Sequence, residues 1–99
     1  GIGLRNQQLE PFLMTVAPGA STIDQPITHP GEEFVYCLKG EIEYCVEDHI
    51  YRLEVGDSLL FEAARPHCFR NGTDRPAELM IVFQADRGTH LARQRHLEL

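Results

Sequence analysis

Short runs of alternating hydrophobic and polar residues recur along this chain, separated by residues that favour turns. Seven segments carry the pattern: Phe12 to Ala17, Glu33 to Lys39, Glu41 to Glu47, Ile50 to Glu54, Ser58 to Glu62, His67 to Arg70 and Ala77 to Gln84. A period of two residues is typical of β-strands, and helical periodicity is nearly absent. The breaks hold turn formers such as Pro18-Gly19, Gly40, Gly56-Asp57 and Asn71-Gly72. The pattern predicts an all-β protein, an antiparallel sandwich or barrel, with almost no helix before residue 86.

The second segment places a carboxylate on a hydrophobic face. Glu33 shares its face with Val35 and Cys37, and the opposite face carries Phe34, Tyr36 and Leu38. This alternation indicates a strand that is buried on both faces, with Glu33 pointing inward. An ionised carboxylate in an apolar interior is costly unless it is paired or binds a metal. The natural partners are His29, four residues earlier, and His67, in the sixth segment.

The length of the chain limits its organisation. Ninety-nine residues support one domain with a modest core. We expect a single domain over residues 1–99, with a β core from about residue 9 to residue 85. Residues 86–99 lack alternation and form a polar C-terminal tail, either a short helix from His90 to Leu97 or a mobile segment.

Charge and hydropathy argue against two classes of partner. The net charge of −6 would repel a phosphate backbone, and the chain shows no helix-turn-helix, zinc-finger or aromatic and basic pattern. We therefore expect no direct contact between this chain and nucleic acid. It also has no apolar run long enough to span a bilayer and no signal-peptide pattern, which predicts a soluble, cytoplasmic domain without a membrane partner.

The chain has three cysteines, Cys37, Cys45 and Cys68, and no Cys-x-x-Cys pair. An odd number without paired spacing predicts reduced thiols that pack as small hydrophobic side chains. A ligand role for Cys45 or Cys68 is the alternative.

Two groups of residues resemble the motifs of the cupin family. His29-x-x-x-Glu33 followed by Gly40 resembles the second half of the first cupin motif, and Gly56-Asp57 with Pro66-His67 and Asn71 resembles the second motif. The resemblance covers about residues 18–83. It implies an antiparallel double-stranded β-helix, the jelly-roll or cupin barrel.

The resemblance also implies a divalent metal site. The full first motif begins His-x-His, and its first histidine would fall at Ile27 in this chain. His29, Glu33 and His67 remain as three of the four usual ligands. Two alternatives follow: a weakened or lost site, or a triad of two histidines and one carboxylate that suits Fe(II) and is also usable by Zn(II), Mn(II) or Ni(II).

The amino-acid sequences of the motifs narrow the resemblance to one group of cupin domains. His-Pro-Gly-Glu-Glu-Phe-Val-Tyr-Cys-Leu-Lys-Gly-Glu and Arg-Pro-His-Cys-Phe-Arg-Asn are similar to the C-terminal cupin domain of bacterial regulators that carry an XRE-type helix-turn-helix upstream. This similarity implies a domain that senses a small-molecule effector and forms a homodimer.

Two functions therefore stand side by side. The first is a binding module for an effector, with or without a metal. The second is a metal-dependent enzyme of the non-haem Fe(II) oxygenase or isomerase type. No motif supports Tyr44 or Glu43 as a general acid or base, and no catalytic residue is assigned. The candidates to line a ligand pocket, which could equally be core packing, are Val35, Cys37, Tyr44, Phe61, Phe69 and Phe83.

Overall fold

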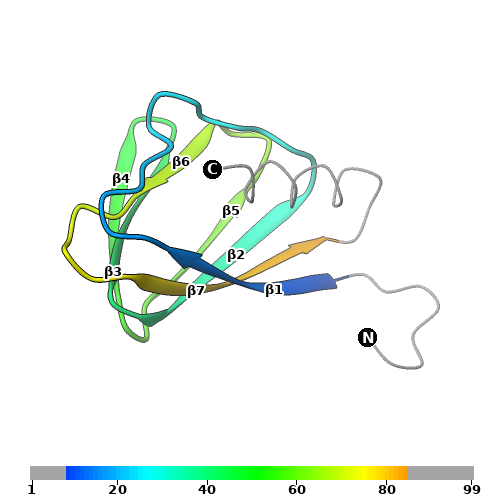
Figure 1. Cartoon of the computed structure of the whole chain (residues 1–99). Coiled ribbons are helices and arrows are strands. Elements are labelled where there is room, and N and C mark those ends of the chain that lie inside the picture. Colours follow the sequence, from blue (N-terminus) through cyan, green and yellow to red (C-terminus); the bar gives the residue numbers. More distant parts are fainter. Residues whose placement is uncertain (1–8, 85–99) are drawn as a thin grey trace.

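A computed structural model describes residues 9–84 of the chain, and seven strands follow one another in this part (Figure 1). They are β1 (Leu9–Val16), β2 (Glu32–Lys39), β3 (Glu41–Val46), β4 (His49–Glu54), β5 (Ser58–Glu62), β6 (His67–Arg70) and β7 (Ala77–Gln84). Every predicted segment is a strand, and β1 begins three residues before the predicted boundary. The predicted C-terminal tail, residues 86–99, lies outside the described residues.

The strands form two antiparallel sheets that enclose a common interior (Figure 1). Sheet A has the order β1-β7-β2-β5, and sheet B has the order β4-β3-β6. The last strand, β7, lies between β1 and β2, so the chain crosses back to the strands with which it began. This architecture confirms the prediction of an all-β jelly roll. Within residues 9–84, no helix is long and apolar enough to cross a membrane.

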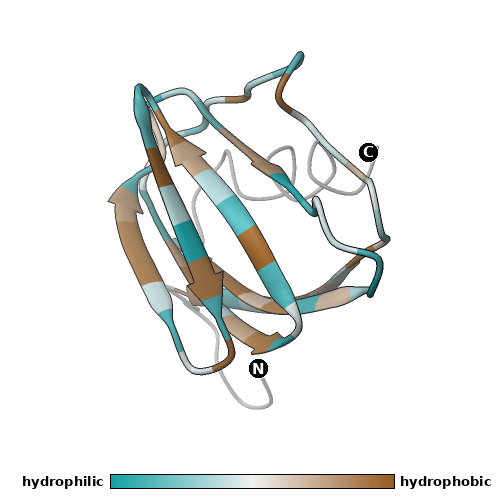
Figure 2. Cartoon of the chain, turned by 90° about the vertical axis from the view of Figure 1, so that its left-hand side faces the viewer, coloured by the Kyte–Doolittle hydropathy of each residue, from teal (hydrophilic) through white to brown (hydrophobic). Residues whose placement is uncertain are grey.

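Hydrophobic and hydrophilic residues alternate along the strands, as the bands in Figure 2 show, and burial follows the same alternation. On β3, Ile42, Tyr44 and Val46 are buried, whereas the residues between them are half-buried. The buried cluster comprises Phe12, Met14, Val16, Val35, Cys37, Ile42, Tyr44, Val46, Leu53, Phe69, Ala77, Leu79, Ile81 and Phe83. The prediction that β2 is buried on both faces is wrong on its outer face, where Leu38 is 40% exposed, because no further element among residues 9–84 covers that side of sheet A.

Two motif residues have structural roles. Gly40 joins β2 to β3 with a φ of 75°, and a Cβ at this position would lie 2.7 Å from the carbonyl oxygen of Pro76, so only glycine fits. The buried Asn71 side chain donates hydrogen bonds to the carbonyl oxygens of Val16 (3.0 Å) and Arg75 (2.7 Å). It therefore ties the loop between β6 and β7 to the end of β1.

The two sheets separate along one side. Tyr51 on β4 lies opposite the inward-facing Tyr44 of β3, yet its side chain is 40% exposed. The strands β4 and β5 are the edges of different sheets. Inward-facing side chains of these edges therefore reach solvent.

Candidate metal site and adjoining cavity

His29, Glu33 and His67 come from three backbone segments that hydrogen bonds hold together. The segment before β2 runs beside β6, because Ile27 and His67 exchange two backbone hydrogen bonds of 3.0 Å each. Further along, the amide of His29 donates to the carbonyl oxygen of Ala63 at 2.9 Å. Glu33 is the second residue of β2 and His67 the first residue of β6. The positions of the three side chains are thus set by the fold.

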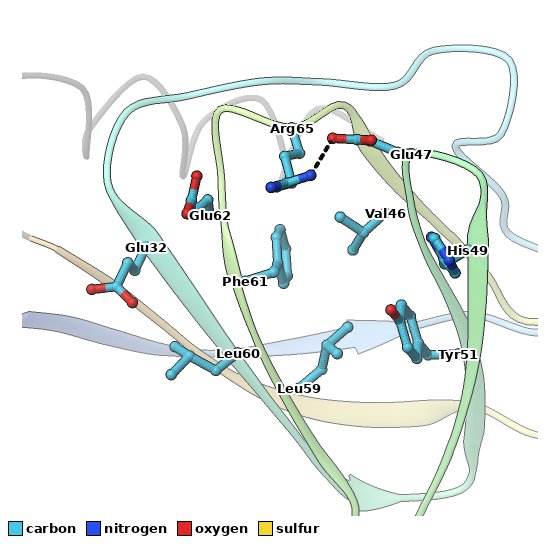
Figure 3. Close-up of a pocket in the computed structure, with 10 residues that line it drawn as sticks. All are labelled: Glu32, Val46, Glu47, His49, Tyr51, Leu59, Leu60, Phe61, Glu62 and Arg65. Carbon is cyan, nitrogen blue, oxygen red and sulfur yellow. Dashed lines mark hydrogen bonds and ion pairs between the residues drawn. The ribbon is translucent and has the colours of Figure 1, made fainter.

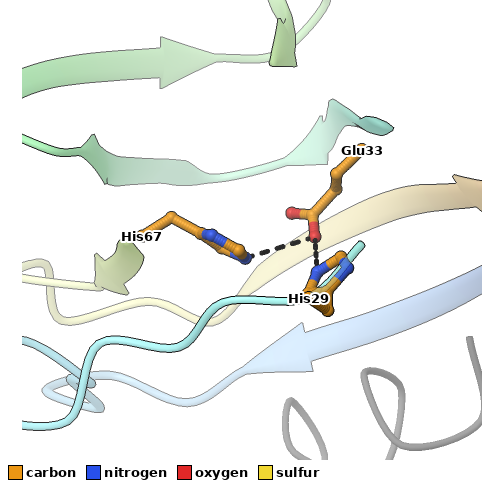
Figure 4. Close-up of side chains that lie close together, drawn as sticks. All are labelled: His29, Glu33 and His67. Carbon is orange, nitrogen blue, oxygen red and sulfur yellow. Dashed lines mark hydrogen bonds and ion pairs between the residues drawn. The ribbon is translucent and has the colours of Figure 1, made fainter. Parts of the chain in front are cut away.

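The three side chains point toward one another in the barrel interior (Figure 4). His29 Nε2 lies 2.9 Å from Glu33 Oε1, and His67 Nε2 lies 3.5 Å from the same oxygen. One ligand atom from each residue lies within 4.8 Å of the others. The exposed fractions are 6% for His29, 0% for Glu33 and 1% for His67. The convergence that spacing and motif resemblance suggested is present in the fold.

The contacts of the two histidine rings are compatible with a cation between them and Glu33. His67 Nδ1 lies 2.8 Å from the carbonyl oxygen of Arg65, and His29 Nδ1 lies 3.3 Å from that of Pro30. A carbonyl oxygen only accepts, so His67 Nδ1 donates to Arg65, whereas His29 has an oxygen acceptor within hydrogen-bond distance of each ring nitrogen. In neutral His67, Nε2 then carries a lone pair that faces the Glu33 carboxylate. This is the arrangement by which metal-binding histidines are oriented in proteins.

Tyr44 completes the polar cluster around Glu33. Its hydroxyl donates a hydrogen bond of 2.5 Å to Glu33 Oε2. Burial, followed by the charge of Glu33, raises the pKa of Tyr44 well above 10.0. The phenol therefore stays protonated and holds one carboxylate oxygen, which leaves Oε1 directed at the two histidines.

The donor set fits a divalent ion with open coordination positions. Two imidazole nitrogens and one carboxylate oxygen suit Zn(II) and first-row metals such as Fe(II). Ile27, at the position of the first motif histidine, is half-buried and pairs with His67 through its backbone. Its side chain has no donor atom, so three protein ligands are what this part of the chain offers.

A cavity of about 460 Å³ lies between β4 and β5 (Figure 3). Its lining comprises Glu32, Val46, Glu47, His49, Tyr51, Leu59, Leu60, Phe61, Glu62 and Arg65. At its rim, Arg65 Nη1 lies 2.8 Å from Glu47 Oε1. This volume is within the range of small-molecule sites.

Phe61 connects the cavity to the triad. Its ring lies edge-on to His67, with centroids 4.9 Å apart, and its centroid lies 5.8 Å from that of Tyr44. Of the residues expected to line a ligand pocket, Phe61 is in the cavity lining. The other five, Val35, Cys37, Tyr44, Phe69 and Phe83, lie in the buried core.

Sequence reasoning missed most of the cavity lining. His49 and Tyr51 begin β4 and are exposed, and Arg65 lies in the turn before β6. The available signal was the alternation in β4, which places Tyr51 on the same face as the buried Leu53.

The three thiols differ in surroundings. All are free: Cys37 is buried, and Cys45 and Cys68 are half-buried. Burial raises the pKa of Cys37. Burial, with a hydrogen bond to Cys45, raises the pKa of Cys68 to about 12. That the three thiols are reduced stays a prediction from their spacing.

Comparison with protein families supplies the decisive match. The model of the Cupin domain matches residues 12–83, most of the described strands and all three residues of the triad. The chain belongs to the cupin family.

Individual cupins differ in what they do. The chain is 35% identical over 69 residues to the HTH-type transcriptional regulator PuuR of Escherichia coli, a match that covers 70% of this chain and 37% of PuuR. It is 36% identical over 59 residues to dimethylsulfoniopropionate lyase DddQ of Ruegeria pomeroyi, covering 59% of this chain and 29% of the lyase. The chain thus spans about a third of the length of these relatives.

The solved structures that resemble this chain likewise include both a regulator domain and an enzyme. The cupin domain of an XRE family transcriptional regulator from Enterobacter cloacae superposes with a TM-score of 0.70 at 25% identity, covering 81% of this chain and 84% of that one. The structure of DddQ superposes with a TM-score of 0.72 at 28% identity, covering 82% and 40%. The cupin fold and the relationship to regulator cupin domains are therefore shown, and cupin enzymes are also among its neighbours.

Proposed function

We propose that this domain binds a divalent metal ion through His29, Glu33 and His67 and uses the site to hold a small-molecule effector. The observation that carries the proposal is the pair of Nε2 atoms directed at one buried carboxylate oxygen, with each Nδ1 held by a backbone carbonyl. When bound, the ion supplies a Lewis acid with open positions for a ligand atom. Tyr44 keeps Glu33 oriented, and Phe61, which packs against His67 and lines the cavity, links the ion site to the cavity.

The effector would occupy the cavity between β4 and β5. Half of its lining is apolar or aromatic and half is polar or charged, so it offers a small molecule both apolar contacts and groups that fix its orientation. The regulator relationship supports a role in which occupancy is passed to a DNA-binding domain in the cytoplasm. We propose that such a domain accompanies this one in the complete protein.

A thermal-shift screen of metabolites on the metal-loaded domain tests this function. A ligand that binds only the folded state raises the melting temperature in a concentration-dependent way. Tyr51→Ala removes an aromatic wall of the cavity and should abolish the shift. Ile50→Ala, the adjacent and outward-facing position on β4, should keep it. A shift that persists in Tyr51→Ala would place the effector elsewhere.

The second candidate function is metal-dependent catalysis, and the similarity to DddQ favours it. The two functions differ in the fate of the ligand. We expect the stabilising compound to be recovered unchanged after incubation with the Fe(II)-loaded domain and oxygen. Consumption at a rate that depends on His29 and Glu33 would replace the sensor with an enzyme.

We also propose that the domain is a homodimer joined through the outer face of sheet A. This face exposes Leu13 (71%) and Leu60 (63%) beside the half-buried Phe34 and Val82. In a domain of net charge −6, two copies repel each other least where they meet over a face with few charges. Leu13→Glu should give a monomer in sedimentation analysis. Ile50→Glu, equally exposed on sheet B, should remain dimeric, and a dimer that survives Leu13→Glu would contradict this interface.

A further inference from the structure

Two cysteines face each other on the outer surface of sheet B. Cys45 on β3 and Cys68 on β6 are register partners in the antiparallel pair. Their chain neighbours Tyr44, Val46 and His67 are buried, so both thiols point away from the interior. Burial and the neighbouring Cys45 thiol raise the pKa of Cys68 to about 12, as expected for two thiols in close proximity. The fold thus places side by side two thiols that lie far apart in the sequence.

The backbone hydrogen bonds of β6 show whether Cys45 and Cys68 form a hydrogen-bonded or a non-hydrogen-bonded cross-strand pair. His67 exchanges its backbone hydrogen bonds with Ile27, so the amide and carbonyl of Cys68 face β3. Cys45 and Cys68 therefore form a hydrogen-bonded pair, with Cα atoms about 5.5 Å apart. This Cα separation is within the range found in disulfides. The Cβ atoms of cross-strand pairs are about 5 Å apart, however, and must approach to about 3.8 Å for a disulfide to form. A bond is feasible, and its strain makes it easy to reduce.

The surroundings favour a disulfide over a metal site. On the other side of β3, Cys45 lies opposite the apolar Ile50. The neighbouring charged residues on this face are Glu43 and Arg70, which pair with each other: Arg70 Nε lies 3.8 Å from Glu43 Oε2. Within residues 9–84, the cluster of three potential metal ligands is His29, Glu33 and His67. Two sulfurs without a further donor do not make the four-ligand site that structural zinc requires.

We propose that Cys45 and Cys68 form a reversible disulfide by exchange with a low-molecular-weight disulfide such as oxidised glutathione. The thiolate of one cysteine attacks a sulfur of the reagent, forming a mixed disulfide and releasing one glutathione. The second cysteine then attacks the protein sulfur of that mixed disulfide and releases the other glutathione. The two protons lost by the protein thiols are carried by the two glutathione thiols, so the protein is oxidised by two electrons and the reagent is reduced by two.

Thiol counting on the full chain tests the proposal. After incubation of the folded protein with excess oxidised glutathione and removal of the reagent, the free thiols measured in denaturant should fall from three to one. The intact mass should fall by two hydrogens, and reduced glutathione should restore both values. Cys37, which is 0% exposed, is the thiol that remains.

Single substitutions separate this bond from general oxidation. Cys37→Ser should fall from two free thiols to none, because it keeps the facing pair. Cys45→Ser and Cys68→Ser should each keep Cys37 free and gain at most the mass of one glutathione. Far-ultraviolet circular dichroism confirms that each variant is folded. Three free thiols in oxidised wild-type protein, or a covalent dimer on a non-reducing gel, would overturn the proposal.

Discussion

The two ends of the barrel interior are built from the same strands but from different chemistry. At one end, β2 contributes Glu33, and the side chains around it are His29, His67 and Tyr44. At the other end, the same strand contributes Cys37, whose register partner on β7 is Leu79. Both ends exclude water, since Glu33, Cys37 and Leu79 are all 0% exposed.

This difference separates stability from function. Burial of apolar side chains lowers the free energy of the folded state, whereas burial of a charged carboxylate costs several kcal/mol before its partners compensate. Replacing a buried polar network with apolar residues is often neutral or stabilising. A fold selected for stability alone would have apolar side chains throughout the interior, as it has around Leu79. The polar end is therefore where we expect the chemistry.

The largest effect on stability should come from the apolar end. Leu79→Ala leaves a cavity in a fully buried layer and should lower the free energy of unfolding by about 2–5 kcal/mol. Ile50→Ala, at a position that is 68% exposed, should change it by less than about 0.5 kcal/mol. Chemical denaturation measures both. Metal content per folded molecule should match wild type in each variant, and loss of metal in folded Leu79→Ala would show that the two ends are not separable.

Metal should stabilise the polar end. An ion at about 100 times its dissociation constant adds about 2.7 kcal/mol to the free energy of unfolding. Glu33→Gln keeps the shape of the side chain but removes the charge, so the added stability should be lost. Denaturation with and without Zn(II) tests this prediction. Equal stabilisation of Glu33→Gln and wild type would place the ion away from the triad.

A smaller effect is expected when the donor to Glu33 is removed. Tyr44→Phe deletes the hydroxyl that donates to Glu33 Oε2, which should cost about 1–3 kcal/mol in the metal-free protein because a buried acceptor loses its partner. The histidines and Oε1 are untouched, so bound metal should persist at reduced affinity. Unchanged stability would mean that this hydrogen bond contributes nothing to the folded state.

The same tyrosine gives a pH dependence of modest size. The pKa of Tyr44 is raised well above 10.0 in the folded protein, so above pH 10 the unfolded chain releases this proton while the folded protein keeps it. The contribution of Tyr44 to stability is present below pH 10 and is lost as the pH rises toward the folded-state pKa. Wild type should therefore lose stability above pH 10 more steeply than Tyr44→Phe. Parallel curves would show that Tyr44 ionises normally.

The alternation of residues and the sequence motifs predicted many of the residues at the two ends of the interior. Alternation placed Glu33, Val35 and Cys37 on one inward face, and all three are fully buried. The motifs identified His29 and His67 as partners of Glu33, and the fold brings them together. These inferences succeeded because a strand with one buried face leaves each side chain a single direction to take.

Features that depend on two sheets were not predicted. The cavity exists because β4 and β5 are edges of different sheets, and no local pattern reports the space between two edges. The pairing of Cys45 with Cys68 depends on the register of β3 against β6, which the intervening strands and turns determine. Likewise, the outer face of β2 was predicted to be buried because its residues are apolar, but the sequence of one strand does not show whether another element packs against it.

Elemental analysis of purified, untagged protein tests the central claim most directly. We expect about one divalent ion per chain in wild type, and a severe loss in His67→Ala because a three-ligand site has little redundancy. His49→Ala, which removes an exposed histidine from the cavity wall, should retain the ion. Metal content that is equal in His67→Ala and wild type would contradict the assignment of the site to His29, Glu33 and His67.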